Sequence, residues 1–146
     1  EVINMKISSP VFEDNGSIPE KYTCEGEDVN PPLEIFDIPE DTKSLVLIMD
    51  DPDAPIGTFI HWVVWNIEPQ NEIKENTVPG EQGMNNFGKT DYGGPCPPSE
   101  EHRYYFKVYA LDTKLDLPDS TTKQDLLDAM KPHILDKAKL MGRFSR

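Results

Sequence analysis

The sequence lacks any long hydrophobic run, and this absence excludes a membrane-spanning helix. No apolar stretch approaches the roughly 18 residues that such a helix needs. Residues 1–4 also lack the basic-then-apolar pattern of a secretory signal peptide. Met5 would be a natural start, so these four residues are interpreted as additions or as the remnant of a removed leader. A cytoplasmic location is therefore expected.

Basic residues are scarce, and this limits the partners that the protein can attract. The chain has 14 Lys and Arg against 27 Asp and Glu, which gives a formal net charge of −13 and a pI near 4.5. A field of that sign repels nucleic acids and anionic membrane surfaces, since both bind through Lys and Arg. The basic residues are also scattered along the sequence. No nucleic acid partner and no membrane association are expected.

Cysteine is scarce too, with only Cys24 and Cys96 in the chain. Their spacing does not fit a metal site of the C-x-x-C kind. A disulfide between them would close a long loop and could stabilise the fold by roughly 4 kcal/mol. A reducing cytosol would instead favour two free thiols. The sequence leaves both states open.

Proline and glycine, by contrast, are abundant, with 14 and 9 residues respectively. No low-complexity tract gathers them, so they are interpreted as turns between short strands. Hydrophobic residues make up 36% of the 146 positions. A chain of this length and composition can bury one core, and we expect a single domain spanning residues 1–146.

Three segments have the composition of β-strands. Residues 45–49 form a short apolar run that predicts a strand buried on both faces, and residues 60–67 are rich in aromatic and β-branched residues. Residues 102–111 alternate, so that His102 and Tyr104 project to the same side, while the opposite side looks wetter. The protein is expected to be mainly β.

The remaining segments are less regular. Residues 68–101 are predicted to be a long functional loop unless they contain short strands. A helix capped by Ser120 or Thr121 should run to about Lys131, because Pro132 cannot continue it. Residues 134–144 fit a helix and a strand equally well. Antiparallel sheets with a C-terminal helix are the predicted architecture.

Several polar residues lie at strand ends or in rigid loops, where functional sites are often built. Each has an ordinary structural explanation: an Asp before Pro stabilises a turn, a lone His is usually hydrogen-bonded within the fold, and a strand Tyr usually belongs to the core. As a group they remain candidates. They are Asp51, Asp53, His61, His102 and Tyr104.

Four motifs in this order resemble the phosphatidylethanolamine-binding protein family, which includes Raf kinase inhibitor protein and the plant flowering-time regulators. The motifs are Asp-Pro-Asp-Ala-Pro at 51–55, His-Trp at 61–62, Tyr-Gly-Gly-Pro-Cys-Pro-Pro at 92–98 and His-Arg-Tyr at 102–104. The segments 8–12, 22–26 and 31–33 resemble its short bacterial and archaeal branch. The resemblance covers nearly the whole chain.

The resemblance implies a central, largely antiparallel β-sheet packed on a smaller sheet, with an anion pocket at one end. The implied ligand is phosphate, or a phosphorylated head group or side chain, held without a cofactor and without turnover. Asp53 and Pro55 would shape the loop beside the pocket. The implied pocket residues are Asp51, His61, Cys96, Pro97, His102 and Tyr104.

The resemblance also bears on partners. A phosphoprotein could be bound and modulated through the pocket, and short-branch relatives suggest a homodimer. The chain lacks the longer C-terminal extension of eukaryotic members, so kinase inhibition is not expected.

The residues also permit two kinds of enzyme. His61, His102 and one Asp could form a metal-binding triad of a metal-dependent hydrolase. Cys96 could act as a nucleophile activated by His102. In a binding protein, by contrast, the imidazoles and the phenol would donate hydrogen bonds to the anion, and affinity would fall as pH rises.

Overall fold

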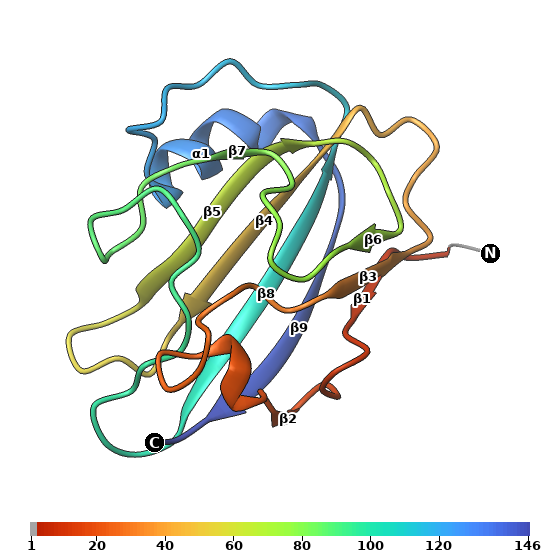
Figure 1. Ribbon diagram of the computed structural model, residues 1–146. Helices are drawn as coiled ribbons and strands as arrows, with labels where there is room; N and C mark the ends of the chain where they lie inside the picture. Colours follow the sequence, from red (N-terminus) through yellow and green to blue (C-terminus); the bar gives the residue numbers. More distant parts are fainter. Residues whose placement is uncertain (1–2) are drawn as a thin grey trace.

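The computed structural model describes residues 3–146 and contains two β-sheets and one α-helix (Figure 1). The larger sheet consists of β2 (Gly16–Ser17), β4 (Ser44–Asp51), β5 (Phe59–Ile67), β7 (Glu81–Gln82), β8 (His102–Leu111) and β9 (Ile134–Phe144), in the order β2-β9-β8-β4-β5-β7. The smaller sheet consists of β1 (Lys6–Ser8), β3 (Leu33–Phe36) and β6 (Glu72–Ile73), in the order β1-β3-β6. The helical elements are α1 (Lys123–Met130) and the 3-10 helices η1 (Glu20–Tyr22) and η2 (Lys131–His133). The predicted mainly β architecture with two sheets is confirmed.

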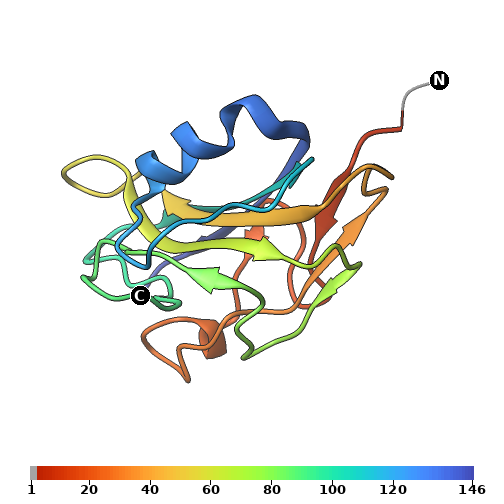
Figure 2. The same cartoon turned by 90° about the horizontal axis from the view of Figure 1, so that it is seen from above.

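The larger sheet lies between α1 on one face and the smaller sheet on the other (Figure 2). Side chains of β4 alternate between the two interfaces: Leu47 and Met49 pack toward the smaller sheet, whereas Val46 and Ile48 pack against α1. All four are fully buried because β4 is an inner strand with both faces covered. The prediction of a doubly buried strand at 45–49 is confirmed.

β8 and β9 form the longest pair of the larger sheet. The alternation predicted for residues 102–111 is present, with Tyr104, Phe106 and Val108 buried on the side of the smaller sheet. Residues 134–144, which fitted a helix and a strand equally well, form β9. This strand pairs antiparallel with β8 along its whole length. Pairing with β8 decides the ambiguous pattern in favour of a strand.

The helix begins later than the sequence predicted. Its N-cap is Thr122, which accepts a hydrogen bond from the backbone N–H of Asp125 at 3.2 Å and completes a capping box. The Thr121 hydroxyl instead donates to the Pro118 carbonyl at 2.6 Å, and the N–H of the first turn is accepted by Thr122. The expected caps Ser120 and Thr121 are therefore wrong by one or two residues.

The segment 68–101 contains two short strands within an otherwise irregular path. β6 pairs with β3 of the smaller sheet, and β7 pairs with β5 of the larger sheet. The segment therefore joins the two layers before it reaches the start of β8. Within residues 3–146, no helix is long and apolar enough to cross a membrane.

Candidate functional site

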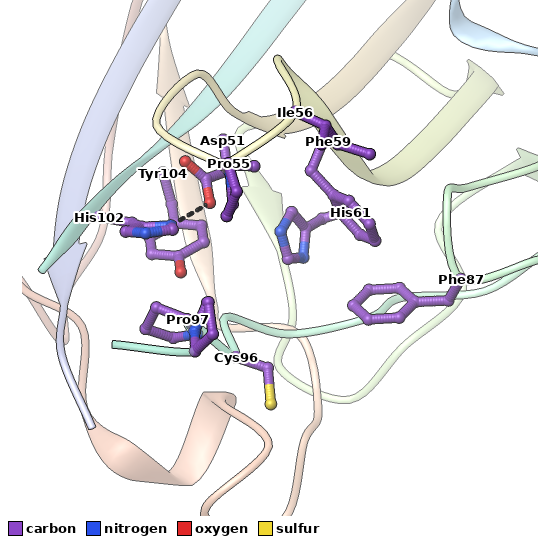
Figure 3. Close-up of a pocket in the computed structure, with 12 residues that line it drawn as sticks. Asp51, Pro55, Ile56, Phe59, His61, Phe87, Cys96, Pro97, His102 and Tyr104 are labelled. Atoms are coloured by element: carbon purple, nitrogen blue, oxygen red, sulfur yellow. Dashed lines mark hydrogen bonds and ion pairs between the residues drawn. The ribbon is translucent and has the colours of Figure 1, made fainter. Parts of the chain in front are cut away.

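A cavity of about 340 Å³ lies where β5, β4 and β8, three neighbouring strands, end at the same edge of the larger sheet. Its size falls in the ordinary range for small-ligand pockets. Figure 3 shows the side chains that surround it. All six pocket residues expected from the sequence line this one cavity: Asp51, His61, Cys96, Pro97, His102 and Tyr104.

Asp51 and His102 form a buried pair at the inner end of the cavity. Oδ2 of Asp51 lies 2.7 Å from Nδ1 of His102, and Oδ1 accepts the backbone N–H of Asp53 at 2.7 Å. The side chains are only 4% and 9% exposed. A carboxylate at this position requires a proton on Nδ1 of His102. The other ring nitrogen, Nε2, is then the one left for a ligand.

His61 lines the cavity because β5 contains a bulge. Met49 and Asp50 of β4 are opposite Trp62 and Ile60 of β5, so one residue of β5, His61, has no partner in the register. Trp62 packs toward the smaller sheet and Ile60 toward α1. The extra residue at a bulge escapes strict alternation, and bulges often re-aim a side chain in this way. The His61 side chain is thereby turned to the cavity.

The His61 ring is held by one hydrogen bond and enclosed by aromatic rings. Nδ1 lies 2.6 Å from the Gly93 carbonyl oxygen, which can only accept, so Nδ1 carries the proton. The rings of Phe59, Phe87 and Tyr104 have centroids 5.1–5.3 Å from the His61 ring. Burial among them lowers the pKa of His61 below its ordinary value.

Three carboxylates oppose this shift without cancelling it. Asp51, Asp28 and Asp50 each favour the charged imidazole, as does the hydrogen bond to Gly93, but desolvation is the largest influence on the His61 pKa. Figure 3 shows the nitrogen-bearing edge of the ring turned toward the space beside Asp51, His102 and Tyr104. Neutral His61 therefore presents Nε2 to the cavity as a hydrogen-bond acceptor.

Tyr104 contributes a hydroxyl group with no partner. The residue is fully buried, and among the described residues its Oη finds no hydrogen bond. Burial raises the pKa of Tyr104, and the charges of Asp51 and Asp53 raise it further. The Cys96 backbone amide opposes this rise but does not lie in hydrogen-bonding geometry. The Tyr104 hydroxyl thus stays protonated and points toward the segment that contains Pro97 (Figure 3).

The wall opposite the sheet is the segment around Cys96 and Pro97. A disulfide joins Cys96 to Cys24 and settles the state that the sequence left open. Gly93 and Gly94 precede it in very close packing: a Cβ at Gly93 would lie 2.3 Å from the Phe87 ring, and one at Gly94 would lie 2.4 Å from Oδ1 of Asp28. Both positions therefore exclude a side chain.

Asp53 does not line the cavity but anchors the loop beside it. Its Oδ2 accepts the backbone N–H and Nε of Arg103 at 2.9 Å, and its Oδ1 accepts an Arg103 terminal N–H at 2.8 Å. The guanidinium lowers the pKa of Asp53 to about 2. Pro55, which was expected only to shape the loop, also forms part of the cavity wall.

The sequence analysis missed the apolar residues of the wall. Ala54, Ile56, Phe59, Phe87 and Pro98 complete the lining. Ile56 is 98% exposed and Phe87 43% exposed, which is unusual for large apolar side chains in loops. An isolated Ile and Phe among Gly, Asn and Pro were the available signals, but nothing in the sequence placed them around one opening.

The structure bears on the two enzyme hypotheses in different ways. The Cys96 nucleophile is contradicted, because its sulfur is bonded to that of Cys24 and cannot form a thiolate in this state. Within residues 3–146, no three or more His, Cys, Asp or Glu side chains gather in a way that could hold a metal ion. A cavity with a buried polar end and an apolar opening is typical of small-ligand binding sites.

The chain belongs to the phosphatidylethanolamine-binding protein family, whose model matches residues 8–145. A UPF0098 protein of Archaeoglobus fulgidus is 52% identical over 143 residues; the match covers 92% of this chain, which spans about half (49%) of that protein's length. The resemblance seen in the sequence motifs is confirmed.

Two solved structures show the same fold over whole chains. A phosphatidylethanolamine-binding protein homologue from Chlamydia trachomatis has a TM-score of 0.95 at 42% identity, with 98% of each chain covered. Escherichia coli YbcL, described as a member of the mammalian family, has a TM-score of 0.90 at 26% identity, with 99% of each chain covered. The expected short bacterial and archaeal branch fits these neighbours.

Proposed function

We propose that this protein binds phosphate, or a phosphorylated head group or side chain, in the cavity between His61 and His102. The observation that carries the proposal is the Tyr104 hydroxyl, which is buried without a hydrogen-bond partner among residues 3–146 and belongs to the same cavity lining as the imidazoles of His61 and His102. A buried polar group of this kind costs roughly 1–3 kcal/mol unless a ligand completes its hydrogen bonds. A tetrahedral anion offers several oxygens at once.

The charges of the site suit a small anion held by nearby donors. Asp51 can act as the counter-charge when His102 takes a second proton on Nε2, so that His102 donates a charge-assisted hydrogen bond. The residues that line the cavity include no Lys or Arg in the described part of the chain. Binding of free phosphate should therefore be weak. Affinity for phosphate should fall as pH rises, because His102 loses the proton that it donates to the anion.

The apolar wall indicates a ligand with an organic group attached to the phosphate. Ile56, Phe59 and Phe87 surround the opening and would contact such a group. A phosphorylated head group or a phosphorylated side chain of a partner would each satisfy this arrangement. A role in modulating a partner protein, and a homodimer, follow as further proposals from the family resemblance.

Calorimetric titration with inorganic phosphate and with O-phosphoethanolamine tests this function. We expect both to bind to the wild type and the ester to bind more tightly. The double variant His61→Ala/His102→Ala should lose at least tenfold in affinity, since each histidine contributes at least one hydrogen bond. The matched control is His133→Ala, because His133 pairs with Asp112 on the surface and does not line the cavity.

The proposal is wrong if neither ligand binds at millimolar concentration, or if all three proteins bind equally. A crystal soaked in phosphate gives a direct check, since the anion should lie between His61 and His102.

The disulfide bears on where the protein works. Disulfides persist in oxidising compartments and in the cytosol of some thermophiles. A cytoplasmic location therefore requires a cell interior that keeps Cys24 and Cys96 bonded. Mass spectrometry of protein from cells lysed in an alkylating reagent tests this point, because a reduced protein would carry two labels.

A further inference from the structure

The hydrogen-bonding roles inside the cavity constrain the protonation state of its ligand. His61 uses Nδ1–H to donate to the Gly93 carbonyl at 2.6 Å, so a neutral ring can offer only the lone pair of Nε2 to a ligand. An anion with no proton has only lone pairs of its own. Two acceptors facing each other repel, and in a buried site the repulsion is not screened by water.

The surroundings of His61 oppose a second proton on the ring. The side chain is buried among Phe59, Phe87 and Tyr104, and the desolvation caused by this burial outweighs the groups that favour the cation. Asp51, the carboxylate with the largest influence on the pKa of His61, already accepts hydrogen bonds from His102 and from the Asp53 backbone with its two oxygens. Asp28 is likewise occupied, since its Oδ1 accepts Gly94 N–H at 2.8 Å.

The other two polar groups have the opposite role. The Tyr104 hydroxyl can donate, and Nε2 of His102 can donate when Asp51 balances its charge. The cavity thus offers donors on one side and an acceptor on the other. A ligand that matches this pattern must accept from Tyr104 and His102 and donate to His61.

We propose, on the basis of the function proposed above, that the cavity selects tetrahedral anions that carry a proton, namely singly protonated phosphate and phosphomonoesters. The P–OH group donates to Nε2 of His61, while two unprotonated oxygens accept from Tyr104 and His102. Sulfate, sulfate esters and phosphodiesters have no such proton at neutral pH. They are discriminated against even though their shape and single negative charge can be the same.

The test compares phenyl phosphate with phenyl sulfate by calorimetry from pH 5.5 to 8.5. The two ligands have the same size and organic group, and the sulfate ester matches the singly protonated phosphate ester in charge. At pH 7 we expect phenyl phosphate to bind at least tenfold more tightly. Above the second pKa of the phosphate ester, about 6, the ratio of its affinity to that of phenyl sulfate should fall about tenfold per pH unit, because a proton gained by His102 affects both esters alike.

Proton counting provides a second readout. Binding enthalpies measured in buffers with different ionisation enthalpies give the number of protons that the complex takes up. At pH 8 the phosphate ester is a dianion in solution, so about one proton should be taken up to form its P–OH group, in addition to any proton that Nε2 of His102 gains on binding. At pH 5.5 the ester already carries this proton, and the contribution of its P–OH group should vanish.

His61→Gln is the diagnostic variant, because the Gln side-chain amide can place an N–H donor near the position of Nε2. This variant should bind phenyl sulfate at least as well as phenyl phosphate, and its proton uptake at pH 8 should fall by about one. His133→Gln, on the surface beside Asp112, is the control and should behave as the wild type.

The outcomes separate the two proposals. Equal affinity of the wild type for the two esters at neutral pH, or proton uptake at pH 8 that His61→Gln leaves unchanged, overturns the inference but leaves anion binding standing. Absence of binding by either ester at any pH overturns both. The selectivity of the wild type is decisive even if His61→Gln fails to fold.

Discussion

Tyr104 has a hydroxyl group that the fold buries without a partner among residues 3–146. The hydroxyl of this residue has opposite effects on the stability of the free protein and on its affinity for a ligand. A hydroxyl left unpaired in the interior destabilises the free protein, whereas the same hydroxyl would stabilise a complex by donating to the ligand. A substitution that removes only the hydroxyl should therefore have effects of opposite sign.

We expect Tyr104→Phe to raise the free energy of unfolding of the free protein by about 1 kcal/mol and to lower affinity for phosphate about tenfold. Urea unfolding and calorimetry measure the two effects. Tyr92→Phe is the matched control: the Tyr92 hydroxyl donates to the Tyr22 carbonyl at 2.7 Å, so its loss should destabilise the protein. A stability loss in Tyr104→Phe equal to that in Tyr92→Phe would show that Tyr104 has a structural partner.

At the scale of elements, the sequence was informative where a simple period governs a strand. The alternation of residues 102–111 placed His102 and Tyr104 on one side correctly. The same rule fails at His61, because a bulge in β5 interrupts the period there. Register depends on pairing between strands, and the sequence of one strand does not contain it.

The loops likewise depend on contacts between segments that the sequence of one segment does not reveal. The sequence motifs identified the polar end of the cavity, but not the apolar wall formed by Ile56, Phe59 and Phe87. Residues 81–82 and 72–73 form strands only because β5 and β3 offer them edges. The N-cap was misplaced because three successive residues, Ser120, Thr121 and Thr122, are all capable of capping, and packing decides among them.

The loop that joins β4 to β5 is attached to the start of β8 by the pair Asp53–Arg103. Asp53→Asn removes the charge and should lower the free energy of unfolding by about 1 kcal/mol at pH 7. The pKa of Asp53 is about 2 in the folded protein and near 3.8 ordinarily, so the folded state binds fewer protons. This contribution is complete above pH 4 and is lost as pH falls toward 2.

Unfolding of the wild type and of Asp53→Asn should therefore differ at pH 7 and converge as pH falls from 4 to 2. Glu68→Gln is the control, because the pair Lys114–Glu68 is largely exposed and should contribute little. A constant difference across that pH range would refute the assignment to Asp53 ionisation. Affinity for phosphate should also fall, since the loop carries Pro55 and Ile56 of the wall.

The disulfide joins the segment around Cys24 to the wall segment at Cys96, 72 positions later in the chain. The double variant Cys24→Ser/Cys96→Ser should lose about 4 kcal/mol of stability by the chain-entropy model. Weaker phosphate binding should accompany the loss, because Cys96 and Pro97 form one side of the cavity. Unfolding with and without a reducing agent measures the first effect, and calorimetry the second. Unchanged affinity in the reduced protein would mean that the glycines and prolines around Cys96 keep this segment in place without the disulfide.

At the scale of the whole molecule, folding redistributes the charges of the sequence. Basic residues are scattered along the chain, but pairing of β8 with β9 places five of them on one face of the sheet: Arg103, Lys107, Lys137, Lys139 and Arg143. Arg103, Lys107 and Arg143 are paired with Asp53, Asp50 and Glu101. Basic residues that are scattered along the sequence thus gather on one face in three dimensions, where carboxylates pair with three of the five.

The net charge of −13 leaves the cavity to attract its anion against the field of the rest of the protein. Repulsion between exposed charges is screened over about 10 Å at 0.1 M salt. Affinity for phosphate should therefore rise as ionic strength increases from 10 to 100 mM, opposite to the behaviour of a basic site. The comparison is made between variants in the same salt, so that any competition by the salt anion is the same for each protein.

Two charge reversals separate the local field from the net charge. Glu100→Lys and Glu40→Lys each change the net charge from −13 to −11, because a charge of −1 becomes +1. Both residues are exposed, but Glu100 lies two positions before His102, whereas Glu40 precedes β4 at the end of the strand opposite Asp51.

At 10 mM salt we expect Glu100→Lys to bind phosphate more tightly than the wild type and to show a weaker salt dependence. Glu40→Lys should have a smaller effect at 10 mM salt, where the screening length is about 30 Å, and almost none at 100 mM, where the screening length falls to about 10 Å and the far end of β4 lies beyond it. Equal effects of the two reversals at 10 mM salt would mean that the total charge governs anion binding.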